Sequence, residues 1–551
     1  MTTTKKPKKQ KLRNAEYYDL QATFDKLYSE SKNGKTFTKI MPIILSENNI
    51  RLAYRNLKRN SGSRTAGTDH KTIKDLETWK EPDLVRYVRK RLEWYIPQPV
   101  RRVEIAKDNG KTRPLGIPTI QDRLIQQCFL QVLEPICEAK FHDRSFGFRP
   151  NRSQENAVAV AYSLMQIQHL HFVVDLDIKG FFDNVSHGKL LRQMWALGIR
   201  DKTVLSILSA MLKAEVAGIG FPGKGTPQGG IISPLLSNIV LNELDWWISS
   251  QWETMPMRKN YVRTRKNNGV AEKTYAYKVL REKSRLKECY GLRYADDFRI
   301  FCRRRQDAEK LFIATQKWLK ERLGLDISPE KSQIVNLKRK YSEFLGFKMM
   351  VKPNGKSGSK TRYTVVSHVS EKRKKKIKKR ASELVAKIKF PADKFEEHKF
   401  IMDYNSYVMG IHNYYSMATH ANQDFSEIGF SVKRTMKCRL GQRLKKSGNS
   451  LPQYVQEKYG RSKELRYIRG LFVLPISYVQ TRAPKHRPRN WCVYTPEGRA
   501  QVHKSLEKVN LSILHYLMEH PVPSESIEYN DNRLALYCAQ QGKCAVTGTL
   551  L

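Results

Sequence analysis

The sequence is short of acidic residues for its length. Asp and Glu together number 53 in 551 residues, against 101 Lys and Arg, and the formal net charge is +48. Internal ion pairs cannot neutralise an excess of that size, so the chain needs a polyanionic partner, for which nucleic acid is the first candidate. Hydrophobic residues at 40% and aromatic residues at 10% are typical of a globular chain, and the length fits three or four domains.

Long apolar runs and clustered cysteines are also lacking. No stretch approaches about 18 consecutive apolar residues, which excludes a transmembrane helix, and no apolar segment follows the basic N-terminus, so it is not a signal peptide. The 8 scattered cysteines are typical of reduced thiols in a cytosolic protein. A basic chain can also bind an acidic membrane surface, but here the charge is spread along the sequence rather than along one amphipathic helix.

Basic residues gather in several runs. Glu371–Arg380 holds 8 basic residues in ten, and residues 431–447 carry seven with no acid. One such run is often only a solvated helix face. Several runs of one sign, with few acids between them, favour phosphate contacts.

Two segments place acids within apolar sequence. Phe172–Asp183 is predicted to be a buried strand that carries Asp177 and ends at a glycine, and Tyr290–Cys302 is predicted to be a hairpin with Asp296-Asp297 at its tip. Adjacent carboxylates repel each other, and a divalent cation relieves that repulsion. If strand and hairpin lie side by side, three carboxylates meet at a two-metal site that joins an attacking hydroxyl to a nucleotide α-phosphate. The alternative is an exposed acidic turn beside an unrelated strand.

Glycine-rich sequence lies between the two acidic segments. The paired glycines of Gly225-Thr-Pro-Gln-Gly-Gly230 allow a backbone to approach a nucleotide closely. Gly218–Gly223 matches the spacing of a dinucleotide-binding fingerprint, but Pro222 and Pro227 prevent the helix start that this fingerprint requires.

In this order the motifs resemble those of a reverse transcriptase, and more narrowly those of the proteins encoded by bacterial group II introns, which are reverse transcriptase–maturases. The series is Asp177-Ile-Lys-Gly-Phe-Phe-Asp183, then Thr226-Pro-Gln-Gly-Gly230, then Tyr294-Ala-Asp-Asp297. Further blocks agree at residues 113–118, 121–123, 145–150, 328–331 and 344–347. The resemblance covers roughly residues 40–530.

The resemblance implies a catalytic metal site. Asp177 and Asp296 would hold two Mg²⁺ ions, Asp297 would be a nearby participant, and the carbonyl of Ile178 would be a further ligand. Asp175 lies two residues before Asp177 and so on the same strand face, but the family motif points to Asp177.

The resemblance also implies a nucleotide pocket. Phe182 would lie beneath the sugar, where its ring would clash with a 2′-hydroxyl, so deoxynucleotides are preferred. Lys107 and Arg113 would bind the triphosphate, because cations there face developing phosphate charge. Gln228 would order the pocket, and Lys331 would protonate the pyrophosphate leaving group.

The fold implied is an α+β right-hand polymerase. Its predicted parts are a basic N-terminal segment at 1–35, fingers and palm at 36–364, a helical thumb or maturase domain X at 365–450, and a DNA-binding region at 451–530. The fingers include an N-terminal extension with a polar loop at Asn60–Asp69. Tyr404, Tyr407, Tyr414 and Tyr415 are predicted to form thumb core rather than base-stacking platforms.

Intron RNA is expected to bind cations of the thumb. The residues predicted for this contact are Lys374, Lys375, Lys376, Lys378, Lys379, Lys433, Arg434 and Arg439.

The function implied is RNA-templated DNA synthesis from dNTPs, together with binding of the group II intron RNA to promote splicing and mobility. The expected partners are the intron RNA, an RNA template and a DNA primer or target, with no membrane; a homodimer is left open. The expected location is the bacterial cytoplasm, within a ribonucleoprotein. Two alternatives remain: an RNA-binding splicing cofactor without polymerase activity, and a reverse transcriptase of the retron or CRISPR type.

The last residues, 531–551, resemble the opening of an HNH endonuclease domain. Cys538 and Cys544 are present, but no histidine follows them before Leu551. Two thiols alone cannot complete a four-ligand metal site, so we expect a truncated remnant that forms a loose tail and does not nick DNA.

Overall fold

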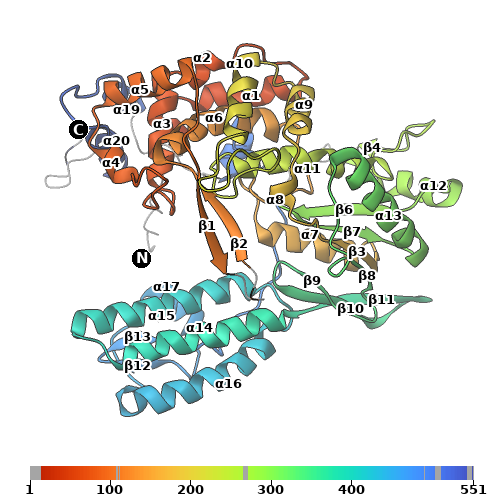
Figure 1. The fold of residues 1–551 in the computed structure, drawn as a ribbon. Coiled ribbons are helices and arrows are strands. Elements are labelled where there is room, and N and C mark those ends of the chain that lie inside the picture. The colour runs from red at the N-terminus through yellow and green to blue at the C-terminus, as the bar shows by residue number, and fades with distance from the viewer. Residues whose placement is uncertain are drawn as a thin grey trace.

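The structure is a computed structural model that describes residues 14–106, 110, 112–264, 271–488, 491–502, 511–540, 542 and 549. Lys107 and Cys544 lie outside the described residues. The chain mixes helices with antiparallel strands, and Figure 1 shows an upper body and a lower helical block. No helix among the described residues is both long enough and apolar enough to cross a membrane.

The N-terminal part of the body is helical. Its helices are α1 (Gln21–Lys32), α2 (Met41–Ile44), α3 (Glu47–Lys58), α4 (Ile73–Glu77), α5 (Glu81–Glu93) and α6 (Ile120–Glu138), after a short 3-10 helix at Asn14–Tyr18. The apolar α6 is buried along most of its length and packs against α1 and α3. Between α3 and α4 the predicted polar loop is confirmed, and Arg123 of α6 donates to the carbonyls of Gly62 and Thr65 at 2.7 and 2.6 Å. The hairpin of β1 (Arg101–Ala106) and β2 (Thr112–Ile117) follows α5.

A four-stranded antiparallel sheet forms the centre of the body. Its strand order is β6 (Cys289–Tyr294), β7 (Asp297–Cys302), β3 (Phe172–Leu176), β8 (Gln333–Asn336). Helices α7 (Gln154–Gln166) and α11 (Ser233–Ser250) pack against β6, and α13 (Arg305–Trp318) packs against β3, β7 and β8. The other elements here are α8 (Phe181–Asn184), α9 (His187–Leu197), α10 (Lys202–Leu212), β4 (Arg263–Thr264), β5 (Ala271–Glu272), α12 (Thr274–Lys283) and a π-helical turn at Leu319–Leu323.

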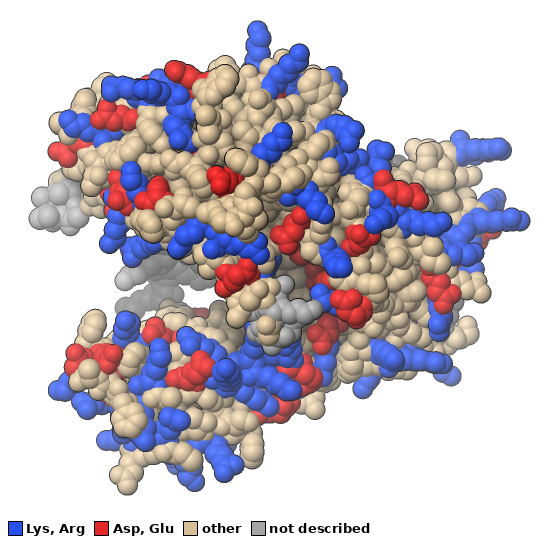
Figure 2. All heavy atoms as spheres, in the orientation of Figure 1, with Lys and Arg blue, Asp and Glu red and all other residues tan. Residues whose placement is uncertain are grey.

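A second sheet leads from the body to the lower block. It has the order β11 (Lys360–Val369), β10 (Phe347–Ser357), β9 (Ser342–Phe344). The block contains α14 (Glu371–Lys389), α15 (Lys394–Tyr415), α16 (Ala421–Leu440), a 3-10 turn at Gly441–Arg443, α17 (Gln453–Tyr459), β12 (Arg466–Ile468) and β13 (Leu471–Val473). Tyr404 and Tyr415 are buried, and Tyr407 and Tyr414 are half-buried against the same core, which confirms the core interpretation of these tyrosines. Figure 2 shows a hollow between this block and the body, with Lys and Arg along both edges.

The C-terminal part of the chain returns to the N-terminal helices. It contains α18 (Pro496–Val502), α19 (Leu511–Glu519) and α20 (Ile527–Ala539). The Tyr494 hydroxyl donates to Glu134 Oε2 at 2.7 Å, and Arg55 of α3 forms an ion pair at 2.6 Å with Asp531 of α20, both side chains fully buried. The expectation of a loose tail is therefore wrong for residues 531–539, because α20 packs against α3 and α5, and the boundary expected at residue 531 falls inside this helix.

Candidate active site

The two acidic segments predicted from the sequence lie on neighbouring strands. In the β3–β7 ladder Asp175 faces Arg299 and Leu176 faces Phe298. Asp177 is the next residue after β3, and Asp297 is the first residue of β7. The expectation that strand and hairpin lie side by side is therefore confirmed, and the alternative of an unrelated acidic turn is excluded.

The hairpin tip is a tight two-residue turn. Tyr294 pairs with Asp297, so Ala295 and Asp296 form the turn, and Ala295 has a φ of +57°. Two-residue hairpin loops require positive φ, which is strained for alanine. Gly147 packs against this turn, since a Cβ on Gly147 would lie 2.2 Å from the Ala295 nitrogen. A glycine at 147 is thus needed for the backbone to pass behind the tip.

A buried polar network holds the tip from behind. Arg293 of β6 is 1% exposed, and its Nε and Nη2 bond the carboxylate of Asp245 on α11, the latter at 2.6 Å. Its Nη1 donates to the Ala295 carbonyl at 2.8 Å and to Asn238 Oδ1 at 2.9 Å. Asn238 donates in turn to the Gly147 carbonyl at 2.9 Å. One guanidinium therefore ties the turn that carries Asp296 to α11 and to the loop that contains Gly147.

The three predicted carboxylates line one cavity. Its volume is about 560 Å³. Lys331 Nζ lies 3.0 Å from Asp177 Oδ2, and Arg299 Nη1 donates to Asp297 Oδ1 at 2.6 Å. Asp296 is exposed, and Asp177 and Asp297 are partly exposed, so solutes can reach all three carboxylates. The other lining residues are Asp175, Leu176, Gln333, Tyr341 and Glu343.

Asp175, unlike the three accessible carboxylates, is buried and paired with neighbouring side chains. It is 5% exposed, Ser342 Oγ donates to its Oδ2 at 3.0 Å, and Arg299 Nε lies 2.7 Å from its Oδ1. Burial raises the pKa of Asp175, although Arg299 opposes the shift. Arg299 therefore bridges Asp175 and Asp297 and keeps two neighbouring carboxylates in place.

The pKa of Asp297 reflects the acidic side chains that surround it. Burial raises the pKa of Asp297, the charges of Asp296 and Asp177 raise it further, and Arg299 lowers it. Among the described residues no three His, Cys, Asp or Glu side chains are grouped closely enough to hold an ion as they stand. Two of the three predicted carboxylates are instead paired, Asp177 with Lys331 and Asp297 with Arg299.

The backbone at Ile178 takes part in a short bridge. Ile178 pairs with Ile327, and the two bonds of that bridge are donated by Ser328 N to the Asp177 carbonyl at 2.7 Å and by Lys179 N to the Asp326 carbonyl at 2.8 Å. The bridge therefore does not use the Ile178 carbonyl, which the sequence predicted as a ligand.

Three of the residues predicted for the nucleotide, Arg113, Phe182 and Gln228, are linked at a second surface. Lys331 lines the carboxylate cavity instead. Arg113 Nε donates to Gln228 Oε1 at 2.5 Å. The glycine-rich loop lies against β2, since a Cβ on Gly229 would be 2.2 Å from the Gly116 carbonyl oxygen. The same loop reaches α8, where Thr226 N donates to the Phe182 carbonyl at 2.7 Å. The Phe182 side chain is 7% exposed and packs edge-on against Phe181.

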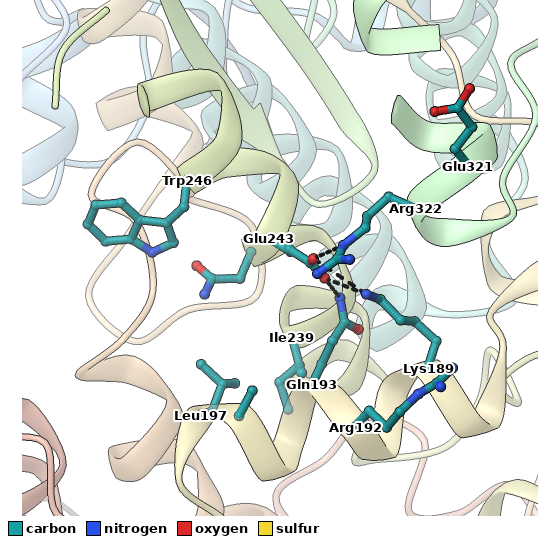
Figure 3. Close-up of a pocket in the computed structure, with 11 residues that line it drawn as sticks. Lys189, Arg192, Gln193, Leu197, Ile239, Glu243, Trp246, Glu321 and Arg322 are labelled. Carbon is teal, nitrogen blue, oxygen red and sulfur yellow. Dashed lines mark hydrogen bonds and ion pairs between the residues drawn. The ribbon is translucent and has the colours of Figure 1, made fainter. Parts of the chain in front are cut away.

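A cavity of about 650 Å³ lies elsewhere, between α9, α11 and the turn at Leu319–Leu323 (Figure 3). Lys189, Gln193 and Arg322 all bond Glu243 there. None of the predicted site residues lines this cavity, so its larger size does not make it the candidate active site.

The cations predicted to bind RNA have unequal environments. Lys375, Lys376, Lys379, Arg434 and Arg439 are exposed. Lys374 is buried, with its Nζ 2.7 Å from Glu427 and 3.0 Å from Glu371, so its assignment to phosphate is wrong. Lys378 also pairs with Glu427 at 2.7 Å, and Lys433 pairs with Glu464. The bonds from Lys374 and Lys378 lower the pKa of Glu427 to about 2.

Sequence reasoning missed Arg299 and the Arg293–Asp245 pair. An arginine within an apolar strand was the available signal, since a buried arginine requires an acidic partner. The partner of Arg293 is 48 residues away in the chain, so the sequence alone did not identify it.

Comparison with known proteins defines the class of the chain. Residues 105–349, which include all three predicted carboxylates, match the family described as reverse transcriptase (RNA-dependent DNA polymerase).

Individual relatives narrow the class. The group II intron-encoded protein LtrA of Lactococcus lactis subsp. cremoris is 31% identical over 443 residues, covering 72% of this chain and 73% of LtrA. Protein YkfC of Escherichia coli is 35% identical over 266 residues, covering 47% of this chain and 68% of YkfC. Nuclear intron maturase 2, mitochondrial, of Arabidopsis thaliana is 25% identical over 29% of this chain and 28% of its own length. The chain belongs to the group II intron-encoded protein family and is a reverse transcriptase, an RNA-directed DNA polymerase, with maturase function.

Proposed function

We propose that this chain copies RNA into DNA at the cavity lined by Asp177, Asp296 and Asp297, in a right-hand arrangement with α14–α16 as thumb. The observation that carries the proposal is the convergence of these three carboxylates from β3 and the β6–β7 hairpin on one accessible cavity. In-line joining of a primer 3′-hydroxyl to a dNTP α-phosphate requires such a cluster of hard oxygen ligands.

The donor set fits Mg²⁺, the expected cofactor. Carboxylate and carbonyl oxygens are the ligands that Mg²⁺ prefers, and Asp177, Asp296 and the Ile178 carbonyl would hold it, with Asp297 beside them. When bound, the ions would lower the charge on the attacking and leaving oxygens. Lys331 pairs with Asp177 and Arg299 pairs with Asp297, so both cations offset the repulsion among the acids.

The chain's own residues would orient the nucleotide. Arg113 and Gln228 already bond each other, so an arriving triphosphate would meet a positioned guanidinium. Lys331 lies beside Asp177 and can donate a proton to a leaving phosphate oxygen. Phe182 is anchored by its backbone to Thr226, which fits a fixed ring that excludes a 2′-hydroxyl. Lys107 stays a prediction, because it lies outside the described residues.

Primer extension tests this proposal. The full chain, with Mg²⁺, dNTPs and a DNA primer on an RNA template, should synthesise cDNA, and Asp296→Asn should abolish synthesis because it removes a ligand charge. Asp83→Asn on α5 is the matched control, since Asp83 is an exposed acid distant in sequence from the motifs. Asp296→Asn should still bind RNA. Undiminished synthesis by Asp296→Asn would contradict the site.

We also propose that the exposed cations of α14 and α16 bind the group II intron RNA and thereby support splicing and mobility, in a cytoplasmic ribonucleoprotein. Joint replacement of Lys375, Lys379 and Arg434 by Gln should weaken binding of the intron RNA. The slope of log K against log salt should flatten by roughly 0.7 to 0.9 for each phosphate that is no longer neutralised. Lys374→Gln is the matched control: it should lower the stability of the thumb by removing the bonds to Glu427 and Glu371, and leave the salt slope unchanged.

Two finer points stay predictions. They are the homodimer and the likeness of residues 531–551 to the opening of an HNH domain.

A further inference from the structure

Phe148 is a large apolar residue in an unfavourable place. Its side chain is 52% exposed and its backbone has a φ of +57°. Both properties cost free energy: an exposed ring orders water, and a bulky L-residue with positive φ is a true conformational outlier. Strain of this kind persists where surrounding contacts impose it, and such places are often binding sites.

The contacts that impose the strain are made by the residues on either side of Phe148. Phe146 N donates to the Arg293 carbonyl at 2.9 Å, and the Gly147 carbonyl accepts from Asn238 at 2.9 Å. On the other side, the Arg149 guanidinium donates to the carbonyls of His142 and Ser145 at 2.5 and 2.8 Å and to Glu138 at 2.7 Å. The residues before and after Phe148 are therefore fixed, and the ring is held out from the surface between them.

The loop that carries Phe148 touches the turn that carries Asp296. Gly147 touches Ala295, and the Cα of Phe148 is one residue away, about 3.8 Å from that of Gly147. Arg293 bonds the Ala295 carbonyl and accepts, through its own carbonyl, the amide of Phe146. The same arginine thus positions both the acidic turn and the strained loop, and Phe148 follows directly after the residue that touches the turn.

We propose that Phe148 is a contact residue for the primer–template duplex, with its ring packed against the sugars or bases of the pair nearest the carboxylates. This inference rests on the proposed function and deepens it. An aromatic ring can stack on any of the bases, because every base has a π-face. An enzyme that copies templates of any sequence requires contacts of this kind. The rigid loop lowers the entropy cost when the ring packs against the duplex.

Binding and stability measured together test the proposal. The probe is a fluorescent DNA primer annealed to an RNA template, titrated with the full chain in the absence of dNTPs. Phe148→Ala and Phe148→Gly should each weaken binding by roughly 5- to 100-fold, the range expected when one stacked aromatic ring is removed. Phe148→Trp should retain the affinity. Phe148→Gly should have a Tm equal to or above that of the wild type, because glycine relieves the positive φ.

A matched control separates strain from binding. His169 has a φ of +56° and is exposed, but it follows α7, at the opposite end of that helix from Phe148. His169→Gly should raise or preserve Tm and leave primer–template affinity unchanged.

Two results would overturn the proposal. Wild-type affinity in both Phe148→Ala and Phe148→Gly would show that the ring touches no duplex, and a large drop in Tm in both would show that it packs the core. These failures are distinguishable from failure of the proposed function, which would appear as a wild-type chain that makes no cDNA.

Discussion

Replacement of Asp245 should lower stability and impair cDNA synthesis, although no catalytic carboxylate is replaced. Asp245→Ala leaves the Arg293 guanidinium buried with no counter-charge, since the Asp245 carboxylate receives three of its hydrogen bonds. Breaking a buried pair in this way costs about 3–5 kcal/mol, against a total of about 5–15 kcal/mol for a typical domain. Tm should fall by roughly 6–20 °C, measured by scanning calorimetry.

A double substitution separates stability from positioning. Arg293→Met with Asp245→Leu replaces the ion pair by apolar side chains of similar size, which is often neutral for stability. It also removes the donor to the Ala295 carbonyl, so the turn that carries Asp296 is no longer fixed. A displacement of about 1 Å can cost roughly 100-fold in rate. We expect a Tm near that of the wild type and cDNA synthesis slower by roughly that factor.

The control is another fully buried ion pair, Arg55–Asp531, which joins α3 to α20. Asp531→Ala should lower Tm to a similar extent, but cDNA synthesis per folded molecule should be unchanged. If the Arg293→Met/Asp245→Leu chain is stable and synthesises cDNA at the wild-type rate, Arg293 does not position the turn.

Three further predictions follow from single residues. Phe182→Ala should admit ribonucleotides in primer extension, and unchanged discrimination between rNTPs and dNTPs would make Phe182 core packing only. Gly147→Ala should slow cDNA synthesis, because the new Cβ meets the Ala295 nitrogen; wild-type kinetics would show that the two backbones can separate freely. Burial lowers the pKa of His412 to about 4, so the unfolded chain binds the extra proton; thumb stability should fall by about 3 kcal/mol as pH drops from 6.5 to 4, and His412→Gln should flatten that dependence in thermal melts.

The sequence predicted the local features of the site better than its long-range contacts. The motif order placed Asp177 beside the Asp296-Asp297 turn correctly, because each motif carries its own strand or turn signal. The loop at Asn60–Asp69 was likewise evident from its small polar residues. Lys374 was assigned wrongly because a run of lysines does not reveal that Glu427, on another helix, faces one of them.

The return of the C-terminal chain to the N-terminal helices was not predicted either. Its anchor joins Arg55 to Asp531, residues 476 apart, and no local pattern connects them. The family resemblance implied a DNA-binding region at residues 451–530. In the structure, Arg482 and Arg499 of this region form ion pairs with Glu155 and Asp25 of the body.

The metals for polymerisation should bind at Asp177 and Asp296. Iron(II) substituted for Mg²⁺, with ascorbate and peroxide, cleaves the backbone near the bound ion, and the fragments can be mapped by mass spectrometry. We predict cleavage near residues 177 and 296, suppressed by excess Mg²⁺ and absent in Asp296→Asn. Cleavage mapped instead to the Glu243 cavity, or unchanged in Asp296→Asn, would contradict the account.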